Sequence, residues 1–226
     1  MNYIFWVSLL LIFYTYVGYP VLVYLFSLFL KRDIRKEKFC PTVSILMSVY
    51  NEQNNIEQKI KNLMQLDYPK EKLEILIGSD GSTDNSETII SKYANNGIKL
   101  YKQDTRKGKP SMLNILAAQS QGQILVFTDA RQRLRKDCLK MLVRNFSDDS
   151  VGSVSGQLIF ESENTKVGNG VGLYWRYEKF IRNCESKIGS MLGATGALYA
   201  IRQELFPELP KDLILDDVYY EDKGKQ

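Results

Sequence analysis

The sequence predicts an α/β fold with a Rossmann-like, mostly parallel sheet and flanking helices, preceded by one apolar N-terminal helix. From residue 43 onward, short β-branched and apolar runs alternate with segments of helical periodicity, as in chains built from βαβ units. The runs lack regular polar–apolar alternation, which is typical of parallel strands buried on both faces. Several runs end in a carboxylate, so we expect a polar site along one edge of the sheet.

The first part of the chain, residues 1–30, contains no charged side chain. A helix needs roughly 20 apolar residues to cross a membrane, so this run is long enough. Gly18 and Pro20 lie inside it and predict a kink, which membrane helices tolerate. A signal peptide is the alternative, but the sequence lacks the basic start, short apolar core and small-residue cleavage site of such a peptide. We therefore expect a retained transmembrane helix.

A linker over residues 31–42 follows, and its first part, KRDIRKEK, is rich in basic residues. The positive-inside rule places such a segment in the cytoplasm. A solvated linker that is basic by chance is the alternative, but the position beside the apolar run favours the topological interpretation. We expect a protein of the cell membrane with a single pass near its N-terminus and a cytoplasmic domain over residues 43–226.

The elements of this domain can be predicted in chain order. Ile56, Ile60 and Leu63 recur at helical spacing after the first strand. Asp84 is followed three residues later by Glu87, which is close to a capping box, and Pro110 suits the first turn of a helix. We expect a strand over 43–49, a helix over 55–66, a strand over 73–77, a helix over 84–93, a strand over 98–102, a helix over 110–119, a strand over 124–128, a helix over 137–146 and a strand over 151–160.

Beyond residue 160 the pattern is less regular. Leu173–Cys184, LYWRYEKFIRNC, predicts a helix rich in aromatic and basic residues. Such a helix suits a membrane surface, and it equally suits a helix that packs its aromatic side chains into the domain. GSMLGATGALYAIR then predicts a Gly-rich turn followed by a strand, and LILDDVYY, residues 213–220, an acidic segment.

Composition excludes several classes of function. The 30 basic and 26 acidic residues give a net charge of +4, which is too small to indicate a nucleic-acid partner. The three cysteines are widely spaced without a C-x-x-C pair, so neither a disulfide framework nor a zinc site is expected. The chain contains no histidine, which excludes a Ser–His–Asp triad and an imidazole base. A proton-transfer enzyme of this sequence therefore needs a carboxylate base.

The polar residues after the first two strands suit a nucleoside. Tyr50 offers an aromatic face to a base, and Glu52 can accept hydrogen bonds from a ribose or base. A dinucleotide-binding oxidoreductase would carry G-x-G-x-x-G at this turn, and SVYNEQNN contains no glycine. In SDGSTD, Asp80 can accept from an imide N–H such as that of uracil, whereas Asp84 is expected to cap the following helix. A tight turn without any ligand would also explain SDGSTD.

Two later segments suit phosphate and metal. RKGKP places Lys109 at the start of a helix, where a helix N-terminus and a point charge favour a diphosphate; a solvated basic loop is the alternative. FTDA ends an apolar strand with Asp129. Mg²⁺ and Mn²⁺ take oxygen ligands from one or two carboxylates together with substrate phosphates, although an Asp at a strand end need not bind metal.

Six segments occur in an order that resembles the family 2 glycosyltransferases: VSILMSVYNE, GSDGSTD, RKGKP, VFTDA, GATGALYAIR and LILDDVYY. The likeness is to the membrane-bound branch that includes the cellulose, hyaluronan and poly-N-acetylglucosamine synthases, and it covers about residues 43–220. The resemblance implies a GT-A fold and an inverting transfer of a sugar from a nucleotide-sugar, a UDP-sugar in our expectation. It further implies a polysaccharide or other glycan, or a lipid-linked acceptor, and Mg²⁺ or Mn²⁺ as cofactor.

The resemblance also implies roles for individual residues on the donor side. Tyr50, Glu52 and Asp80 would hold the nucleoside, and Lys109 would lie near the phosphates. Asp129 would be the first Asp of the D-x-D metal motif of the family. Four of these residues follow three predicted strands, and Lys109 begins a predicted helix, so the implied donor site coincides with the polar edge expected from the strand pattern.

On the acceptor side, Asp217 would be the general base that deprotonates the acceptor hydroxyl, with Asp216 as its acidic neighbour. The third position of the D-x-D motif is Arg131, which either supplies positive charge to the diphosphate or points away. The sequence contains no Q-x-x-R-W, and no apolar span follows residue 30. We therefore expect a C-terminally incomplete glycosyltransferase domain. The alternative is a non-catalytic remnant or subunit that binds nucleotide-sugar and needs a second chain for transfer.

Overall fold

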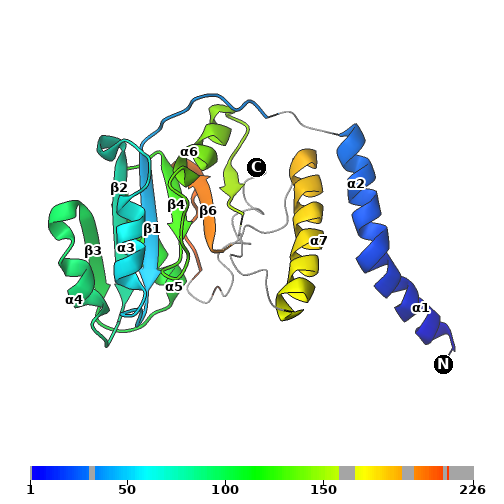
Figure 1. Ribbon diagram of the computed structural model, residues 1–226, viewed down its shortest axis with the longest axis horizontal. Coiled ribbons are helices and arrows are strands. Elements are labelled where there is room, and N and C mark those ends of the chain that lie inside the picture. Colours follow the sequence, from blue (N-terminus) through cyan, green and yellow to red (C-terminus); the bar gives the residue numbers. More distant parts are fainter. Residues whose placement is uncertain (1, 31–33, 158–165, 190–195, 211–212, 214–226) are drawn as a thin grey trace. The chain divides into compact units, whose positions relative to one another are not determined.

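The computed structural model describes residues 2–30, 34–157, 166–189, 196–210 and 213. Contacts within the chain divide it into two units, one of residues 1–33 with 159–192 and the other of residues 34–158 with 193–226. The larger unit contains the β-sheet, and the smaller unit contains the apolar N-terminal helices and one long later helix (Figure 1).

The sheet of the larger unit has six strands in the order β3-β2-β1-β4-β6-β5. Strand β1 pairs in parallel with both β2 and β4, and β2 pairs in parallel with β3. Strand β6 runs antiparallel to β4 and β5. The predicted mostly parallel sheet is therefore confirmed, with an antiparallel pair at one edge. The strands are β1 (Val43–Val49), β2 (Leu73–Asp80), β3 (Ile98–Gln103), β4 (Ile124–Thr128), β5 (Ser153–Ser155) and β6 (Leu198–Arg202).

The strand order reverses direction at β1. Successive strands β1, β2 and β3 extend the sheet to one side, whereas β4 adds on the other side of β1. Open α/β sheets bind ligands at such a switch point, outside the carboxyl ends of the strands. The carboxyl ends of β1, β2 and β4 therefore mark the place where a site is expected.

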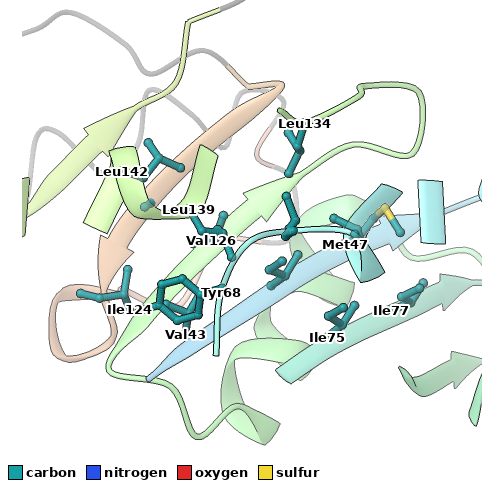
Figure 2. Packing of buried hydrophobic residues seen from close by; sticks show 14 of the residues in the cluster. Val43, Met47, Tyr68, Ile75, Ile77, Ile124, Val126, Leu134, Leu139 and Leu142 are labelled. Atoms are coloured by element: carbon teal, nitrogen blue, oxygen red, sulfur yellow. The ribbon is translucent and has the colours of Figure 1, made fainter. Parts of the chain in front are cut away.

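Helices cover both faces of this sheet. They are α3 (Ile56–Met64), α4 (Ser86–Ser91), α5 (Lys109–Gln119) and α6 (Cys138–Val143), with short 3₁₀ turns between some of the elements. Side chains of α3, α4 and α6 belong to one apolar cluster with the strands, and those of α5 belong to a second cluster. Figure 2 shows part of the first cluster, in which strand residues such as Val126 lie with Leu139 and Leu142 of α6. Each fully buried aliphatic side chain contributes about 1.5–3 kcal/mol to folding.

The start of α4 corrects the predicted cap and capping box. The helix begins at Ser86 and its N-cap is Asn85, which makes no side-chain cap hydrogen bond; Asp84 lies one residue earlier, and its carboxylate accepts the backbone N–H of Ser86 at 2.9 Å in the preceding turn. Glu87 does not fold back to complete a capping box. Its carboxylate instead accepts the Ser79 hydroxyl at 2.7 Å and pairs with Lys102 at 2.7 Å. A neighbouring cation and a strand hydroxyl are stronger partners for this carboxylate than the backbone of its own helix.

A carboxylate at the start of β2 joins three elements. Glu74 accepts the Ser44 hydroxyl at 2.5 Å, the backbone N–H of Gln121 at 2.6 Å and the Lys99 ammonium at 2.8 Å. Burial raises the pKa of Glu74, but the hydrogen bonds from Lys99, Ser44 and Gln121 together outweigh burial and lower the pKa below its ordinary value. The ionised carboxylate therefore stabilises the end of the sheet opposite the switch point.

The smaller unit begins with α1 (Asn2–Phe13), a π-helical segment (Tyr14–Gly18) and α2 (Tyr19–Phe29). Residues 3–29 form a continuous helix that is long and apolar enough to cross a membrane. The irregularity predicted from Gly18 and Pro20 is present as the π-helical segment. In this segment a Cβ on Gly18 would lie 2.9 Å from a ring carbon of Tyr14, so glycine permits the close approach of this ring.

Helix α7 (Lys166–Ile188) contacts the N-terminal helices, and it extends beyond the predicted residues 173–184 at both ends. The Tyr177 hydroxyl donates to the backbone oxygen of Tyr16 at 2.8 Å, and the Tyr19 hydroxyl donates to the Glu185 carboxylate at 2.5 Å. The rings of Tyr24 and Phe180 lie 5.8 Å apart. The aromatic residues of α7 thus bind an apolar helix far away in the sequence, a partner that the sequence did not predict.

Candidate active site

A pocket of about 350 Å³ lies at the carboxyl ends of β1, β2 and β4 in the larger unit. Its wall includes all six residues that the sequence assigned to donor and metal: Tyr50, Glu52, Asp80, Lys109, Asp129 and Arg131. These residues follow different strands and span 82 positions of the chain, from 50 to 131. They meet because parallel strands present their carboxyl ends at the same edge of the sheet.

Asp80 ends β2 and is 2 % exposed. Its Oδ1 accepts the backbone N–H of Lys107 at 2.8 Å, and its Oδ2 accepts the backbone N–H of Gly108 at 2.9 Å. Gly108 has φ 96°, a backbone conformation that favours glycine. The carboxylate therefore holds the loop between β3 and α5. The predicted contact of Asp80 with a base stays a prediction, and it would use the remaining lone pairs of the same oxygens.

Lys109 is the first residue of α5, as predicted from RKGKP. Its ammonium lies 3.4 Å from Oδ1 of Asp129, and both side chains are about two-fifths exposed. An exposed pair of this kind contributes little to stability, so both groups can turn to a ligand without a large loss. A basic group and an acidic oxygen thus face the same part of the pocket.

Asp129 follows β4, so it meets the pocket at the switch point. Within the described ranges, no group of three or more His, Cys, Asp or Glu side chains is placed to hold a metal ion. A cation at Asp129 would need further oxygen ligands, and a bound diphosphate and water are groups that supply them. The hard oxygen of one exposed carboxylate fits Mg²⁺ or Mn²⁺, which commonly bind in this way.

Arg131 lines the pocket and pairs with Glu52. Its Nε donates to Oε1 of Glu52 at 2.9 Å, while Asn55 donates to Oε2 of the same carboxylate at 2.7 Å. The Glu52 side chain is 14 % exposed, whereas that of Arg131 is 73 % exposed. In this structure Arg131 thus faces Glu52, and its predicted role toward a diphosphate stays a prediction. The arginine at the third position of the motif neutralises the first acidic residue of the pocket.

Sequence reasoning missed Arg106, which also lines the pocket. Its guanidinium carbon lies 4.2 Å from the centre of the Tyr50 ring, a distance typical of a cation–π contact. One face of the tyrosine therefore already has a partner. Arg106 opens the RKGKP segment, and its charge beside Lys109 was the available signal.

Lys59 was also missed, and it lies beneath the pocket. The side chain is only 2 % exposed, and its ammonium donates to the Thr128 hydroxyl at 2.8 Å and to the backbone oxygen of Gln132 at 2.7 Å. Burial lowers the pKa of Lys59 to about 8, although the nearby Asp129 carboxylate opposes this shift. The sequence signal was a lysine at helical spacing with Ile56 and Leu63, on the apolar face of α3.

The acceptor side of the predicted site, Asp216 and Asp217, lies outside the described residues, as does part of the Gly-rich turn before β6. The described strand β6 (Leu198–Arg202) confirms the strand predicted after that turn. The roles of Asp216 and Asp217 thus stay predictions from the resemblance alone.

Comparisons with known proteins agree with this geometry. The family model described as glycosyl transferase family 2 matches residues 44–209. Poly-beta-1,6-N-acetyl-D-glucosamine synthase of Staphylococcus aureus (strain MSSA476) is 26 % identical over 198 residues, which cover 87 % of this chain and 46 % of the synthase. Probable glycosyltransferase YdaM of Bacillus subtilis (strain 168) is 32 % identical over 126 residues, which cover 53 % of this chain and 30 % of YdaM.

Solved structures give the same family of folds. The mannosyltransferase PcManGT from Pyrobaculum calidifontis, in complex with GDP-Man and Mn²⁺, matches with a TM-score of 0.76 and 26 % identity over 92 % of this chain and 59 % of that one. Residues 1–349 of S. aureus TarS in complex with UDP-GlcNAc match with a TM-score of 0.55 and 21 % identity, over 81 % of this chain and 53 % of that one. The likeness to TarS shows the GT-A fold alone. The chain spans less than two thirds of the length of each of these relatives.

Proposed function

This chain belongs to glycosyl transferase family 2, and from that premise we propose that it binds a nucleotide-sugar donor and takes part in sugar transfer to a glycan or lipid-linked acceptor. The observation that carries the proposal is that three strand ends and the start of α5 gather Tyr50, Asp80, Lys109 and Asp129 in one pocket. An aromatic face, a buried carboxylate, a basic group and an exposed carboxylate are the groups that a nucleoside, a diphosphate and a divalent cation require.

For the nucleoside, we propose that the base lies beside Tyr50 and donates to Asp80, and that Glu52 faces the ribose. Uracil has one imide N–H and needs one acceptor lone pair of Asp80, so UDP is the donor nucleotide that we favour. Guanine offers two adjacent donors, and GDP-Man is bound by PcManGT. A GDP-sugar is therefore the alternative that a direct binding comparison decides.

For the diphosphate, Lys109 and the adjoining start of α5 supply positive charge and backbone N–H groups. Asp129 would hold a Mg²⁺ or Mn²⁺ ion, which supplies charge neutralisation to the leaving diphosphate when bound. Arg106 and Arg131 line the same pocket and add to its positive field. Stabilisation of developing negative charge by such preorganised groups is commonly the largest contribution to catalysis.

For the transfer step, we propose that Asp217 accepts the proton of the acceptor hydroxyl, with Asp216 as its acidic neighbour. The hydroxyl oxygen then bonds to the anomeric carbon while the bond from that carbon to the diphosphate breaks, which inverts the configuration. The absence of histidine from the sequence supports a carboxylate in this role. Like charge on two adjacent carboxylates raises the pKa of one of them toward a value useful for a base.

For its location, we propose that the helix over residues 3–29 anchors the protein in the cell membrane with the pocket on the cytoplasmic side. The length and apolar composition of that helix support an anchor, and most of its large apolar side chains are exposed. The basic linker after it supports the cytoplasmic orientation. A membrane location would bring the pocket close to lipid-linked or extruded glycan acceptors.

The proposal is tested on the full chain in lipid nanodiscs. Calorimetry with UDP and GDP, each with Mn²⁺ and with chelator, measures binding, and release of nucleoside diphosphate from UDP-GlcNAc and GDP-Man measures turnover. We expect Mn²⁺-dependent binding of one nucleotide and release from the matching sugar donor. Binding without release, even with glycan acceptors added, would favour the non-catalytic binding subunit. No binding of either nucleotide would contradict the proposed function.

A further inference from the structure

A buried ammonium group lies under the pocket without being part of its wall. Lys59 extends from α3 to the end of β4, where its Nζ donates to the Thr128 hydroxyl at 2.8 Å and to the backbone oxygen of Gln132 at 2.7 Å. The residue is 2 % exposed. An ammonium group is costly to bury unless hydrogen bonds replace its water shell, and these two short bonds use two of its three N–H donors.

The two hydrogen bonds of Lys59 hold the two ends of the segment of residues 128–132. Thr128 is the last residue of β4, and Gln132 is the last pocket residue of the loop that follows. Between them lie Asp129 and Arg131, which bring the acidic oxygen and one of the basic groups to the pocket. One side chain therefore fixes both ends of the segment that carries the expected metal ligand.

A further hydrogen bond of Thr128 leads to the start of β6, the strand that pairs with β4. The Thr128 hydroxyl accepts from Lys59 and donates to the backbone oxygen of Ala197 at 3.2 Å. Ala197 directly precedes β6 and follows the Gly-rich sequence GATG. A chain of buried hydrogen bonds thus joins α3, β4 and the start of β6, and its members orient one another.

A neighbouring residue of α3, Asn62, holds the same loop outside the pocket and serves as a comparison for Lys59. Asn62 donates to the backbone oxygen of Leu134 at 2.8 Å and accepts the backbone N–H of Leu134 at 2.8 Å. Leu134 is not part of the pocket wall. Asn62 therefore holds the same loop two residues beyond the pocket, without enclosing a residue that faces a ligand.

We propose that Lys59 is a positioning residue of the donor site, which holds Asp129 and Arg131 in the orientation that a cation–diphosphate unit requires. The ligand named here rests on the proposed function, whereas the ordering of the segment does not. Preorganisation of this kind lets a site bind without first ordering its own loop. Loss of Lys59 should consequently weaken the metal-dependent part of nucleotide binding more than the metal-independent part.

The ordering is tested without any ligand, on the full chain in nanodiscs. Hydrogen exchange is compared between the wild type, Lys59→Met and the matched control Lys61→Met, whose lysine lies on the same helix but is exposed and paired with Glu57. We expect exchange at residues 129–132 to accelerate about tenfold or more in Lys59→Met and to stay at the wild-type rate in Lys61→Met. Unchanged exchange at these residues in Lys59→Met would overturn the proposal. Lys59→Gln, which keeps a hydrogen-bond donor, replaces Lys59→Met if the latter does not fold.

The functional consequence is tested by UDP calorimetry with Mn²⁺ and with chelator. The ratio of the two affinities should fall about tenfold or more in Lys59→Met, while the affinity in chelator changes less than threefold. Asn62→Ala, which loosens the same loop beyond the pocket, should keep the wild-type ratio. An equal fall of the ratio in both variants would show that Lys59 has only a structural role. Absence of both UDP and GDP binding in the wild type would overturn the proposed function instead, and the exchange experiment would still decide the ordering.

Discussion

The substitution Asp80→Asn tests whether the loop that carries Lys109 must be preorganised for donor binding. The native carboxylate accepts two backbone N–H groups, from Lys107 and Gly108, at 2.8 and 2.9 Å. An asparagine of the same size keeps one acceptor oxygen and places an NH₂ group opposite the other N–H. One charge-assisted bond is therefore lost and a buried donor stays unpaired.

The magnitude follows from that single bond. A hydrogen bond to a charged group contributes about 1.5–3 kcal/mol, so the free energy of unfolding should fall by about this amount. If the loop must be ordered before the diphosphate binds, the same loss appears in affinity. A tenfold change corresponds to about 1.4 kcal/mol, so UDP binding should weaken about ten- to a hundredfold.

The assay is UDP calorimetry combined with denaturant unfolding, and Asp84→Asn is the matched control. Asp84 also accepts two backbone N–H groups, from Gln53 at 3.0 Å and from Ser86 at 2.9 Å, but it does not line the pocket. Both variants should lose similar stability, and only Asp80→Asn should lose affinity. Wild-type UDP affinity in Asp80→Asn, or an equal loss in Asp84→Asn, would refute the reasoning.

Three further predictions concern the metal, the base and the sheet. Asp129→Asn should abolish the gain in UDP affinity that Mn²⁺ gives; calorimetry showing the same gain in the variant would exclude Asp129 as the metal ligand, and equal wild-type affinity with Mn²⁺ and with chelator would mean that Arg131 replaces the cation. Asp217→Asn should leave UDP binding unchanged and lower the rate of acceptor-dependent UDP release about 10²–10⁴-fold, since a general base acts mainly in the transition state. A wild-type rate of this release in the variant would exclude Asp217 as the base. Glu74→Gln should lower the free energy of unfolding by about 1.5–3 kcal/mol at pH 7. Because the folded pKa of Glu74 is lowered, its stabilisation is complete above the unfolded value of about 4.5 and disappears as pH falls through the folded pKa, so denaturant titrations that keep the same difference at low pH would contradict it.

The sequence predicted much of the fold because its signals are local. Buried parallel strands are recognisable from short apolar runs, and the start of α5 from a lysine followed by Pro110. The same patterns place Tyr50, Asp80 and Asp129 at strand ends, which is sufficient to predict that they meet at one edge. The predicted capping box at Glu87 failed for the opposite reason, since Ser79 and Lys102 come from neighbouring strands.

Six residues that line the pocket were thus predicted from the sequence, whereas their partners were decided by the tertiary structure. Asp80 binds a loop 27 or 28 residues away, Arg131 binds Glu52 across 79 residues, and Lys59 binds Thr128 across 69 residues. No local pattern encodes these pairs, because they depend on the order in which β3, β2, β1 and β4 lie in the sheet. In the sequence, Lys59 only interrupts the apolar face of the helix that carries it. Only the packing of α3 against the end of β4 shows that this lysine supports the pocket.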